Sequence, residues 1–423
     1  MKIQNVKGSY DYLSKEQRIR SYINKIIKET FEKYGYYEVE TPILCYYDML
    51  SDKYDDNNDI LKEIYKLSDQ GGRNLGLRYD LTIPFAKLIA LNKNTMTFPF
   101  KRYEIAKAFR DGPVKPGRDR EFTQCDADVV GIEGQYVEAE LLSIFVEGYT
   151  RLGIDIIIKF NSRKLMTGLI LESGVNEELV PNVTTIIDKM DKYSTEEINN
   201  FLSELGLSKE QISKLNEYFE MNLSNLENKF KDTDNELIKL GLKEVTDLYE
   251  YTKGIGIDTI CEFSITLARG QNYYTGNVFE VYDKQERLKC SIGAGGRYDN
   301  IIGNFINDGE SYPAVGISFG LSAIYEILKD NDIFNEKSQT DIFIIPIDTK
   351  VESLKLANEL RSKGFNVEIE MNDRKLKKSM EYANKEKIPY VIVLGEDEIK
   401  NNTYIVRDMK NGKNISIDNI IKK

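Results

Sequence analysis

A long block of helical periodicity separates two strand-rich parts of this chain, and this interruption constrains the fold most. From about residue 161 to 255, Leu and Ile recur at spacings of three and four among many Glu, Lys and Asn. Two helix-start patterns lie within it, STEE at 194–197 and SKEQ at 208–211. Strand-like segments precede and follow the block. The sequence therefore predicts a helical insertion in a domain built on a sheet.

The residues outside the block predict one amphipathic helix and several strands. Apolar residues recur at helical spacing from Ile19 to Phe31, and Gly35 ends that helix. One predicted strand continues through Pro42. Strands, with turns between them, are expected within residues 37–44, 75–130, 261–282 and 291–300. The spacing of these short segments favours an antiparallel sheet.

The last part of the chain has a different pattern. A polar linker is expected at 329–340, and apolar strands then alternate with helices to the end. Such alternation is typical of a mostly parallel sheet covered by helices. The predicted organisation is therefore a first domain at 1–328, with the insertion at about 161–255, and a second domain at 341–423.

Composition excludes several classes of protein. The 423 residues contain no run of about 18 apolar residues and no leader-like N-terminus, so we expect a cytoplasmic protein that spans no membrane. The net charge of −11 argues against a general DNA-binding surface. The four cysteines are far apart in sequence, which favours reduced structural thiols over a metal site or disulfides.

Histidine is absent from all 423 residues. This absence excludes Ser-His-Asp and Cys-His catalysis, HExxH metal sites and imidazole proton shuttles. Any chemistry must therefore use carboxylates, arginines, lysines, hydroxyls, backbone groups and bound ions.

One segment presents several cations between two strand-like runs. Residues 102–131, RYEIAKAFRDGPVKPGRDREFTQCDADVVG, hold Arg110, Arg118 and Arg120 around a turn with Lys115. A planar guanidinium grips two phosphate oxygens at once, so this hairpin is suited to phosphate binding. A solvated basic hairpin is the alternative explanation.

This segment resembles motif 2 of class II aminoacyl-tRNA synthetases, in the version found in histidyl-tRNA synthetases. Four further strings are similar to signatures of the same family and follow in the same order: LRYDLTIPFAKLIA (77–90), LARGQNYYTGNVFE (267–280), GAGGRYDNIIG (293–303) and YPAVGISFGLSAI (312–324). The residues after the linker resemble the family's anticodon-binding domain. One departure is Ala323, where motif 3 carries an arginine.

The resemblance implies a fold and an activity. The fold is an α+β catalytic domain on a mostly antiparallel sheet, the class II synthetase fold, with a C-terminal α/β anticodon-binding domain. The activity is ATP-dependent activation of L-histidine, with Mg²⁺, and transfer to tRNA(His) by a homodimer. Two alternatives remain: a non-catalytic paralogue that binds histidine, like the regulatory subunit of ATP phosphoribosyltransferase, and an enzyme with a non-tRNA acceptor.

The resemblance also implies roles for individual residues. Arg110 and Arg269 would hold the α-phosphate from opposite sides, and Arg118 would contribute to ATP binding. The family's contacts to the histidine ammonium fall on Asp80, Thr82 and Gln124. An acid at Asp128 and a tyrosine, either Tyr273 or the favoured Tyr274, would recognise the imidazole. A carboxylate and a phenol can pair both ring nitrogens, which discriminates strongly against apolar analogues.

Overall fold

The computed structural model describes residues 3–51, 59–190, 192–268, 273–331, 338–401 and 403–421. The chain divides into two compact units, Met1–Lys329 and Asp330–Lys423. Arg269, one of the residues expected to bind phosphate, lies outside the described residues.

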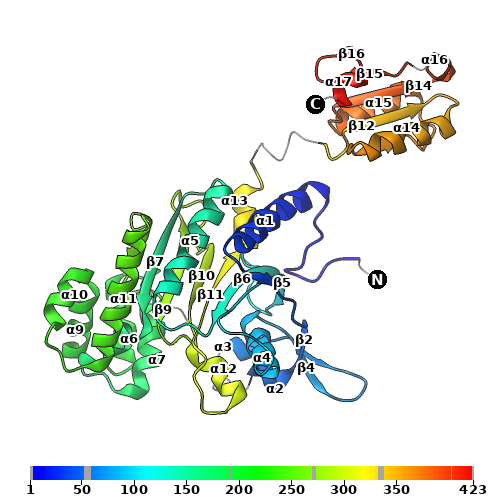
Figure 1. Ribbon diagram of the computed structural model, residues 1–423. Coiled ribbons are helices and arrows are strands. Elements are labelled where there is room, and N and C mark those ends of the chain that lie inside the picture. The colour runs from blue at the N-terminus through cyan, green and yellow to red at the C-terminus, as the bar shows by residue number, and fades with distance from the viewer. Residues whose placement is uncertain are drawn as a thin grey trace. The chain divides into compact units, whose positions relative to one another are not determined.

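The first unit is built on an eight-stranded sheet with the order β1-β5-β6-β11-β10-β9-β7-β8 (Figure 1). Neighbouring strands are antiparallel except at the two ends, where β1 pairs with β5 and β7 with β8 in parallel. The strands are β1 (Tyr37–Glu38), β5 (Phe100–Phe109), β6 (Glu121–Val130), β7 (Ile156–Ser162), β8 (Cys261–Phe263), β9 (Asn277–Asp283), β10 (Gly293–Arg297) and β11 (Ala314–Gly320). The predicted mostly antiparallel sheet is confirmed.

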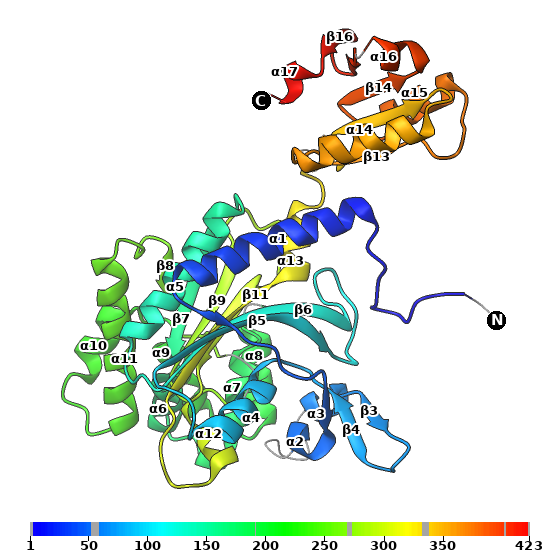
Figure 2. The same cartoon turned by 45° about the vertical axis from the view of Figure 1, so that its right-hand side comes forward.

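Three helices cover one face of this sheet: α1 (Ser14–Lys33), α5 (Tyr136–Arg151) and α13 (Leu321–Leu328) (Figure 2). The helix predicted from the apolar spacing of residues 19–31 is therefore confirmed. It extends beyond these residues at both ends, from Ser14 to Lys33. Phe319 of β11 packs its ring against Phe31 of α1 and Phe145 of α5. Because side chains alternate along a strand, the neighbours of Phe319 face the opposite side, where the cavity lies.

Two expectations for the N-terminal part were wrong. The strand predicted at 37–44 is two strands, β1 and β2 (Leu44–Tyr46), in different sheets. Pro42 lies between them, and its missing N–H interrupts strand pairing. The region from 75 to 130 also contains a helix, α4 (Thr82–Asn92). Most residues of this helix are apolar, and much of it is buried. It therefore lacks the one-sided apolar pattern that identifies a surface helix.

Smaller elements complete this end of the unit. A three-stranded sheet with the order β2-β4-β3 lies beside α4 (Figure 2). Its remaining strands and the helices nearby are β3 (Lys66–Ser68), β4 (Asn74–Leu77), α2 (Tyr47–Ser51), α3 (Asp59–Glu63) and α12 (Asp299–Ile306). Helix α12 packs against α4.

The helical block connects β7 to β8. It comprises α6 (Arg163–Glu172), η1 (Glu177–Leu179), α7 (Val180–Ile187), α8 (Thr195–Glu204), α9 (Lys209–Phe219), α10 (Leu223–Phe230) and α11 (Glu236–Gly254). Ser194 and Ser208 form capping boxes at the starts of α8 and α9, so both helix starts predicted from sequence are confirmed. The block has an apolar core of its own, which includes Met166, Val183 and Leu215.

The second unit is a five-stranded sheet with the order β13-β12-β14-β15-β16. Its elements are β12 (Ile342–Pro346), α14 (Lys350–Ser362), β13 (Val367–Ile369), α15 (Leu376–Lys385), β14 (Tyr390–Leu394), α16 (Glu396–Lys400), β15 (Ile405–Asp408), β16 (Lys413–Ser416) and α17 (Asp418–Ile421). The first three strands are parallel, as predicted, whereas β15 and β16 are antiparallel. A parallel strand needs a crossover connection of about a dozen residues or more. The connections from β14 to β15 and from β15 to β16 are shorter, so these strands pair antiparallel.

Candidate active site

A cavity of about 530 Å³ opens on the face of the large sheet that faces away from α1 and α5. Eight of the nine residues that we expected at a site line it: Asp80, Thr82, Arg110, Arg118, Gln124, Asp128, Tyr273 and Tyr274. The ninth, Arg269, is outside the described residues. Segments far apart in sequence therefore converge on one cavity.

The N-terminus of α4 supplies the first two of these residues. Asp80 is buried, and its Oδ1 accepts a hydrogen bond from the backbone N–H of Ile83 at 3.1 Å. Its Oδ2 is buried and has no hydrogen-bond partner among the described residues. Burial raises the pKa of Asp80 to about 6, although Arg110 and the α4 backbone N–H groups favour the ionised form. Asp80 is thus held in place with one oxygen available.

Strand β6 supplies a row of three polar side chains. Gln124, Asp126 and Asp128 occupy alternate positions, so they share the cavity face of the strand. Cys125 pairs with Phe319 of β11 and lies on the helix-covered face. Gln124 Oε1 and Asp126 Oδ1 are buried and find no hydrogen-bond partner in the described part of the chain.

Asp128 has a close neighbour at each oxygen, although its Oδ2, like Gln124 Oε1 and Asp126 Oδ1, is buried and accepts no hydrogen bond from the described residues. Tyr298 donates its hydroxyl to Asp128 Oδ1 at 2.5 Å, and Arg102 Nη2 lies 2.8 Å from Oδ2. Arg102 stands directly across from Asp128 in the β5–β6 ladder. It also lies 3.4 Å from Glu104 and over the ring of Phe85.

The charges around this face are unbalanced. Three buried acids line the cavity: Asp80, Asp126 and Asp128. The buried Arg102 contacts Asp128 and Glu104, and the buried Arg78 pairs with Glu104. These six charged side chains are two arginines and four carboxylic acids. Burial raises the pKa of Asp126 and of Asp128. The charge of Asp128 raises the pKa of Asp126 further, Glu104 raises that of Asp128 further, and Arg102 lowers both. A ligand that brings positive charge and N–H donors would therefore be complementary to this face.

A cation borders the other part of the cavity. Arg110 follows β5, and its Nε donates to the backbone carbonyl of Tyr79 at 3.0 Å. Its guanidinium lies 5.0 Å from the centre of the Phe122 ring. Arg118 is at the hairpin loop, more exposed, with Nη2 3.4 Å from Glu63. Arg110 is therefore positioned by the fold, whereas Arg118 is on the rim.

Glycines form the floor beneath the aromatic side chains. A Cβ added at Gly296 of β10 would lie 2.7 Å from Tyr274 Cδ1, and one at Gly316 of β11 would lie 1.9 Å from Asp128 Oδ1. The glycine-rich string is thus a strand, and its missing side chains let Tyr274 and Asp128 lie close to the sheet. The centre of the Tyr273 ring lies 4.7 Å from the centre of the Tyr274 ring and 6.2 Å from the centre of the Tyr298 ring.

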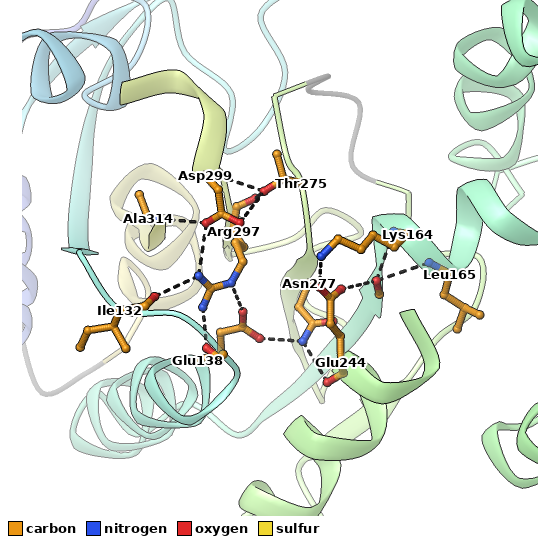
Figure 3. A network of polar contacts seen from close by, with 12 residues as sticks. Ile132, Glu138, Lys164, Leu165, Glu244, Thr275, Asn277, Arg297, Asp299 and Ala314 are labelled. Atoms are coloured by element: carbon orange, nitrogen blue, oxygen red, sulfur yellow. Dashed lines mark hydrogen bonds and ion pairs between the residues drawn. The ribbon is translucent and has the colours of Figure 1, made fainter. Parts of the chain in front are cut away.

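A buried polar network supports this floor from behind (Figure 3). Arg297 of β10 donates through Nε to Glu138 of α5 at 2.6 Å, and Asn277 of β9 donates to the other oxygen of Glu138 at 2.6 Å. Asn277 also donates to the backbone carbonyl of Glu244 in α11, whose carboxylate pairs with Lys164. The network therefore fixes the strands that carry the floor and links them to the helical block.

The described residues offer no dedicated metal cage, because no group of three or more Cys, Asp or Glu side chains is arranged to hold an ion. The four cysteines are free: Cys45, Cys125 and Cys261 are buried, and Cys290 is exposed. Within the part of the chain described, no helix is long and apolar enough to cross a bilayer.

Our sequence analysis missed several residues that line the cavity: Asp126, Tyr298, Phe122 and Asp188. The alternation in QCDADV could have placed Asp126 beside Gln124 and Asp128, since all three are two positions apart. Tyr298 lies in the GGRYD string that was already singled out. Asp188 follows α7 of the helical block, and no local signal could have placed it here.

An antiparallel sheet that carries such a cavity, followed by an anticodon-binding domain, defines a class II aminoacyl-tRNA synthetase. The histidyl-tRNA synthetase family model matches residues 8–324, and the anticodon-binding domain model matches residues 341–423. The chain belongs to the histidyl-tRNA synthetase family.

Individual proteins agree with the family models. Histidine–tRNA ligase 1 of Bacillus cereus is 44% identical over 419 residues, covering 99% of this chain and 98% of that protein. The histidyl-tRNA synthetase of Nostoc sp. PCC 7120 has a TM-score of 0.87 at 28% identity, covering 100% of this chain and 98% of that one. A Bacillus halodurans structure described as an ATP phosphoribosyltransferase regulatory subunit/histidyl-tRNA synthetase has a TM-score of 0.76 at 22% identity, with 90% and 97% covered. At that identity the likeness is one of fold.

Proposed function

We propose that the chain is a histidine–tRNA ligase, which activates L-histidine with ATP and transfers it to tRNA(His). The observation that carries the proposal is a cavity with Arg110 on one side and four buried acceptor atoms on the other. These atoms are Asp80 Oδ2, Gln124 Oε1, Asp126 Oδ1 and Asp128 Oδ2. These acceptors suit the ammonium and ring N–H of histidine. The full-length relatives named histidine–tRNA ligase support this over a regulatory, non-catalytic paralogue.

The first step joins the carboxylate of histidine to the α-phosphorus of ATP. A carboxylate oxygen forms the new P–O bond while the bond to the β-phosphate breaks, and pyrophosphate leaves with the electron pair. Negative charge grows on the phosphoryl oxygens, so a fixed guanidinium is the main requirement. Arg110 supplies it, and we assign Arg269 to the opposite side from the resemblance. A chain without histidine can carry out this step because it needs no imidazole.

The remaining assignments follow the same logic. Asp80, Thr82 and Gln124 bind the ammonium. Asp128 binds the ring, together with Tyr273 or, as we favour, Tyr274. Arg118, on the rim, contacts the outer phosphates. Mg²⁺ enters with the β- and γ-phosphates of ATP, since the described donors form no cage and Mg²⁺ is commonly held by substrate phosphates. A cytoplasmic homodimer that binds tRNA(His) completes the proposal.

The decisive experiment is ATP–pyrophosphate exchange with each of the twenty amino acids, followed by charging of purified tRNA. We expect exchange with histidine alone and charging of tRNA(His) alone. A protein that binds histidine without exchange would be a regulatory paralogue. Exchange with histidine but no charging of any tRNA would indicate a non-tRNA acceptor.

The raised pKa of Asp80, about 6, predicts how histidine binding depends on pH. Above pH 6 the carboxylate is ionised and pairs with the ammonium, whereas below pH 6 it is protonated and the pairing is lost. In Asp80→Asn the pairing is absent at every pH. The KM for histidine in this variant, divided by that of the wild type, should therefore be roughly tenfold or more at pH 8 and fall toward one at pH 5.

This ratio cancels the titration of free histidine, which is the same in both assays. The KM for ATP, measured in parallel, is expected to change much less. A ratio that stays constant from pH 5 to pH 8 would contradict the role of the Asp80 carboxylate.

A further inference from the structure

The cavity presents few cations for a site that accepts ATP. Among the described residues, the cations that line it are Arg110 and Arg118, whereas the acids that line it are Asp80, Asp119, Asp126, Asp128, Asp188 and Glu280. Bound histidine brings an ammonium, but ATP brings several negative charges, of which Mg²⁺ offsets a part. The position at which an arginine was expected, 323, holds a buried alanine that lines the cavity. A buried cation near Ala323 would offset this imbalance.

Arg20 of α1 is a buried cation in this part of the fold. Helix α1 packs against α13 and against β6 (Figure 2). Arg20 is 5% exposed, and its Nη2 donates to Thr123 Oγ1 at 3.3 Å. Its Nη1 is buried and has no hydrogen-bond partner within the described part of the chain. Buried donors are normally paired, so this nitrogen indicates that the guanidinium has unused capacity for an anion.

Thr123 connects the guanidinium to the cavity. The ladder between β6 and β11 ends at the pair Gln124–Gly320, so Thr123 lies beyond it. At this end of the sheet, Thr123 and the first turn of α13, which includes Ala323, line the same cavity. Arg20 therefore contacts the cavity wall from behind, although α1 lies on the opposite face of the sheet.

Aromatic rings hold the guanidinium in place. The Cζ atom of Arg20 lies 4.0 Å from the centre of the Tyr12 ring and 6.0 Å from that of Tyr325, which is in α13 with Ala323. Such contacts position a cation without cancelling its charge. Burial raises the pKa of the cavity-lining Asp119, whereas Ser322 and the charge of Arg20 lower it. The charge of Arg20 is therefore effective at the wall of the cavity.

We propose that Arg20 supplies the positive charge that is missing at Ala323 and stabilises the phosphates of bound ATP from behind Thr123. A charge inside a protein is weakly screened, so it acts across a single side chain. The inference rests on the proposed function and assigns an ATP-binding role to a residue of α1 that lies outside the family motifs.

The test is the KM for ATP in histidine-dependent ATP–pyrophosphate exchange. We expect Arg20→Met to raise it by roughly tenfold or more, with the KM for histidine kept within about twofold. Arg20→Lys keeps the charge but loses the planar guanidinium, so an intermediate KM for ATP is expected. A general loss of folding would instead lower the active fraction and leave both KM values unchanged.

A second substitution tests whether the two positions are equivalent. Ala323→Arg places a guanidinium at the cavity lining, on the first turn of α13. In the Arg20→Met background we expect it to return the KM for ATP to within about threefold of the wild type. In the wild-type background it should change this KM much less, because the charge is already supplied.

Arg151→Met is the matched control. Arg151 of α5 also packs against α1, where it donates to Thr30 Oγ1 at 2.9 Å and to the carbonyl of Ile26 at 3.3 Å, and it does not line the cavity. We expect this variant to have a lower Tm and KM values for ATP and histidine within about twofold of the wild type.

The outcomes separate this inference from the ligase function. An unchanged KM for ATP in Arg20→Met, an equal rise in Arg151→Met, or no recovery with Ala323→Arg would overturn the role of Arg20 and leave the ligase function standing. If Arg20→Met does not fold, Arg20→Lys with and without Ala323→Arg gives the same comparison. A wild-type protein without histidine-dependent exchange would overturn the proposed function itself.

Discussion

Replacing Arg110 by methionine is expected to lower kcat for histidine-dependent ATP–pyrophosphate exchange by roughly 10²–10³. The guanidinium is fixed by its hydrogen bond to the Tyr79 carbonyl and lies over the Phe122 ring. It therefore faces the charge that develops on phosphorus without reorganising during the reaction. Arg110→Lys keeps the charge but loses the planar two-pronged contact, so an intermediate rate is expected.

The matched control is Arg73→Met. Arg73 is an exposed arginine that pairs with Asp69, and neither residue lines the cavity. Surface pairs of this kind contribute little to stability. Exchange activity should stay within about twofold, and the Tm of both variants should be close to that of the wild type. If Arg110→Met kept more than a tenth of the activity, the guanidinium would not be the group that stabilises the transition state.

Replacing Gly316 by alanine should disable the histidine site although Gly316 itself offers no functional group. The new methyl carbon would lie 1.9 Å from Asp128 Oδ1 and 2.7 Å from its Cγ. Gly316 is in β11 between β6 and β10, so its backbone has little room to move. The carboxylate must shift and its contacts with Tyr298 and Arg102 are lost. We expect a loss of stability of about 1–3 kcal/mol and a kcat/KM for histidine at least tenfold lower.

Gly254→Ala serves as the control for this substitution. Gly254 is the last residue of α11, and an added Cβ there meets nothing within 4 Å. Alanine favours helix over glycine, so stability should be unchanged or slightly higher. Thermal unfolding and the KM values for both substrates distinguish the two variants. Equal Tm and equal histidine KM in Gly316→Ala and the wild type would show that Asp128 is not confined by β11.

Much of the fold could be predicted because its signals are local. The helix of residues 19–31 has a one-sided apolar stripe, and Ser194 and Ser208 begin helices with capping boxes. Helix α4 could not be predicted in the same way, because burial on most sides leaves no stripe. The split between β1 and β2 was missed because nothing local indicates that the chain passes from one sheet to another near Pro42.

Only part of the candidate site could be predicted from the sequence, for the same reason. Arg110, Asp80 and Gln124 lie in strings that resemble family motifs, and the fold brings them to one cavity. The contacts of Asp128 are not local: Arg102 stands across the β5–β6 ladder, and Tyr298 is about 170 residues away in the chain. Spacing along β6 shows that Gln124, Asp126 and Asp128 share one face, but not which distant residues contact them.

The helical block leaves the sheet at the end of β7 and returns to it in β8, which pairs with β7 in parallel. Because the two strands are parallel, the block is the crossover that carries the chain from the end of β7 back to the start of β8. Its apolar core is largely its own. A change in the length of the block would therefore leave the sheet intact, provided that the crossover is kept, Asp188 still borders the cavity and Glu244 still meets Asn277.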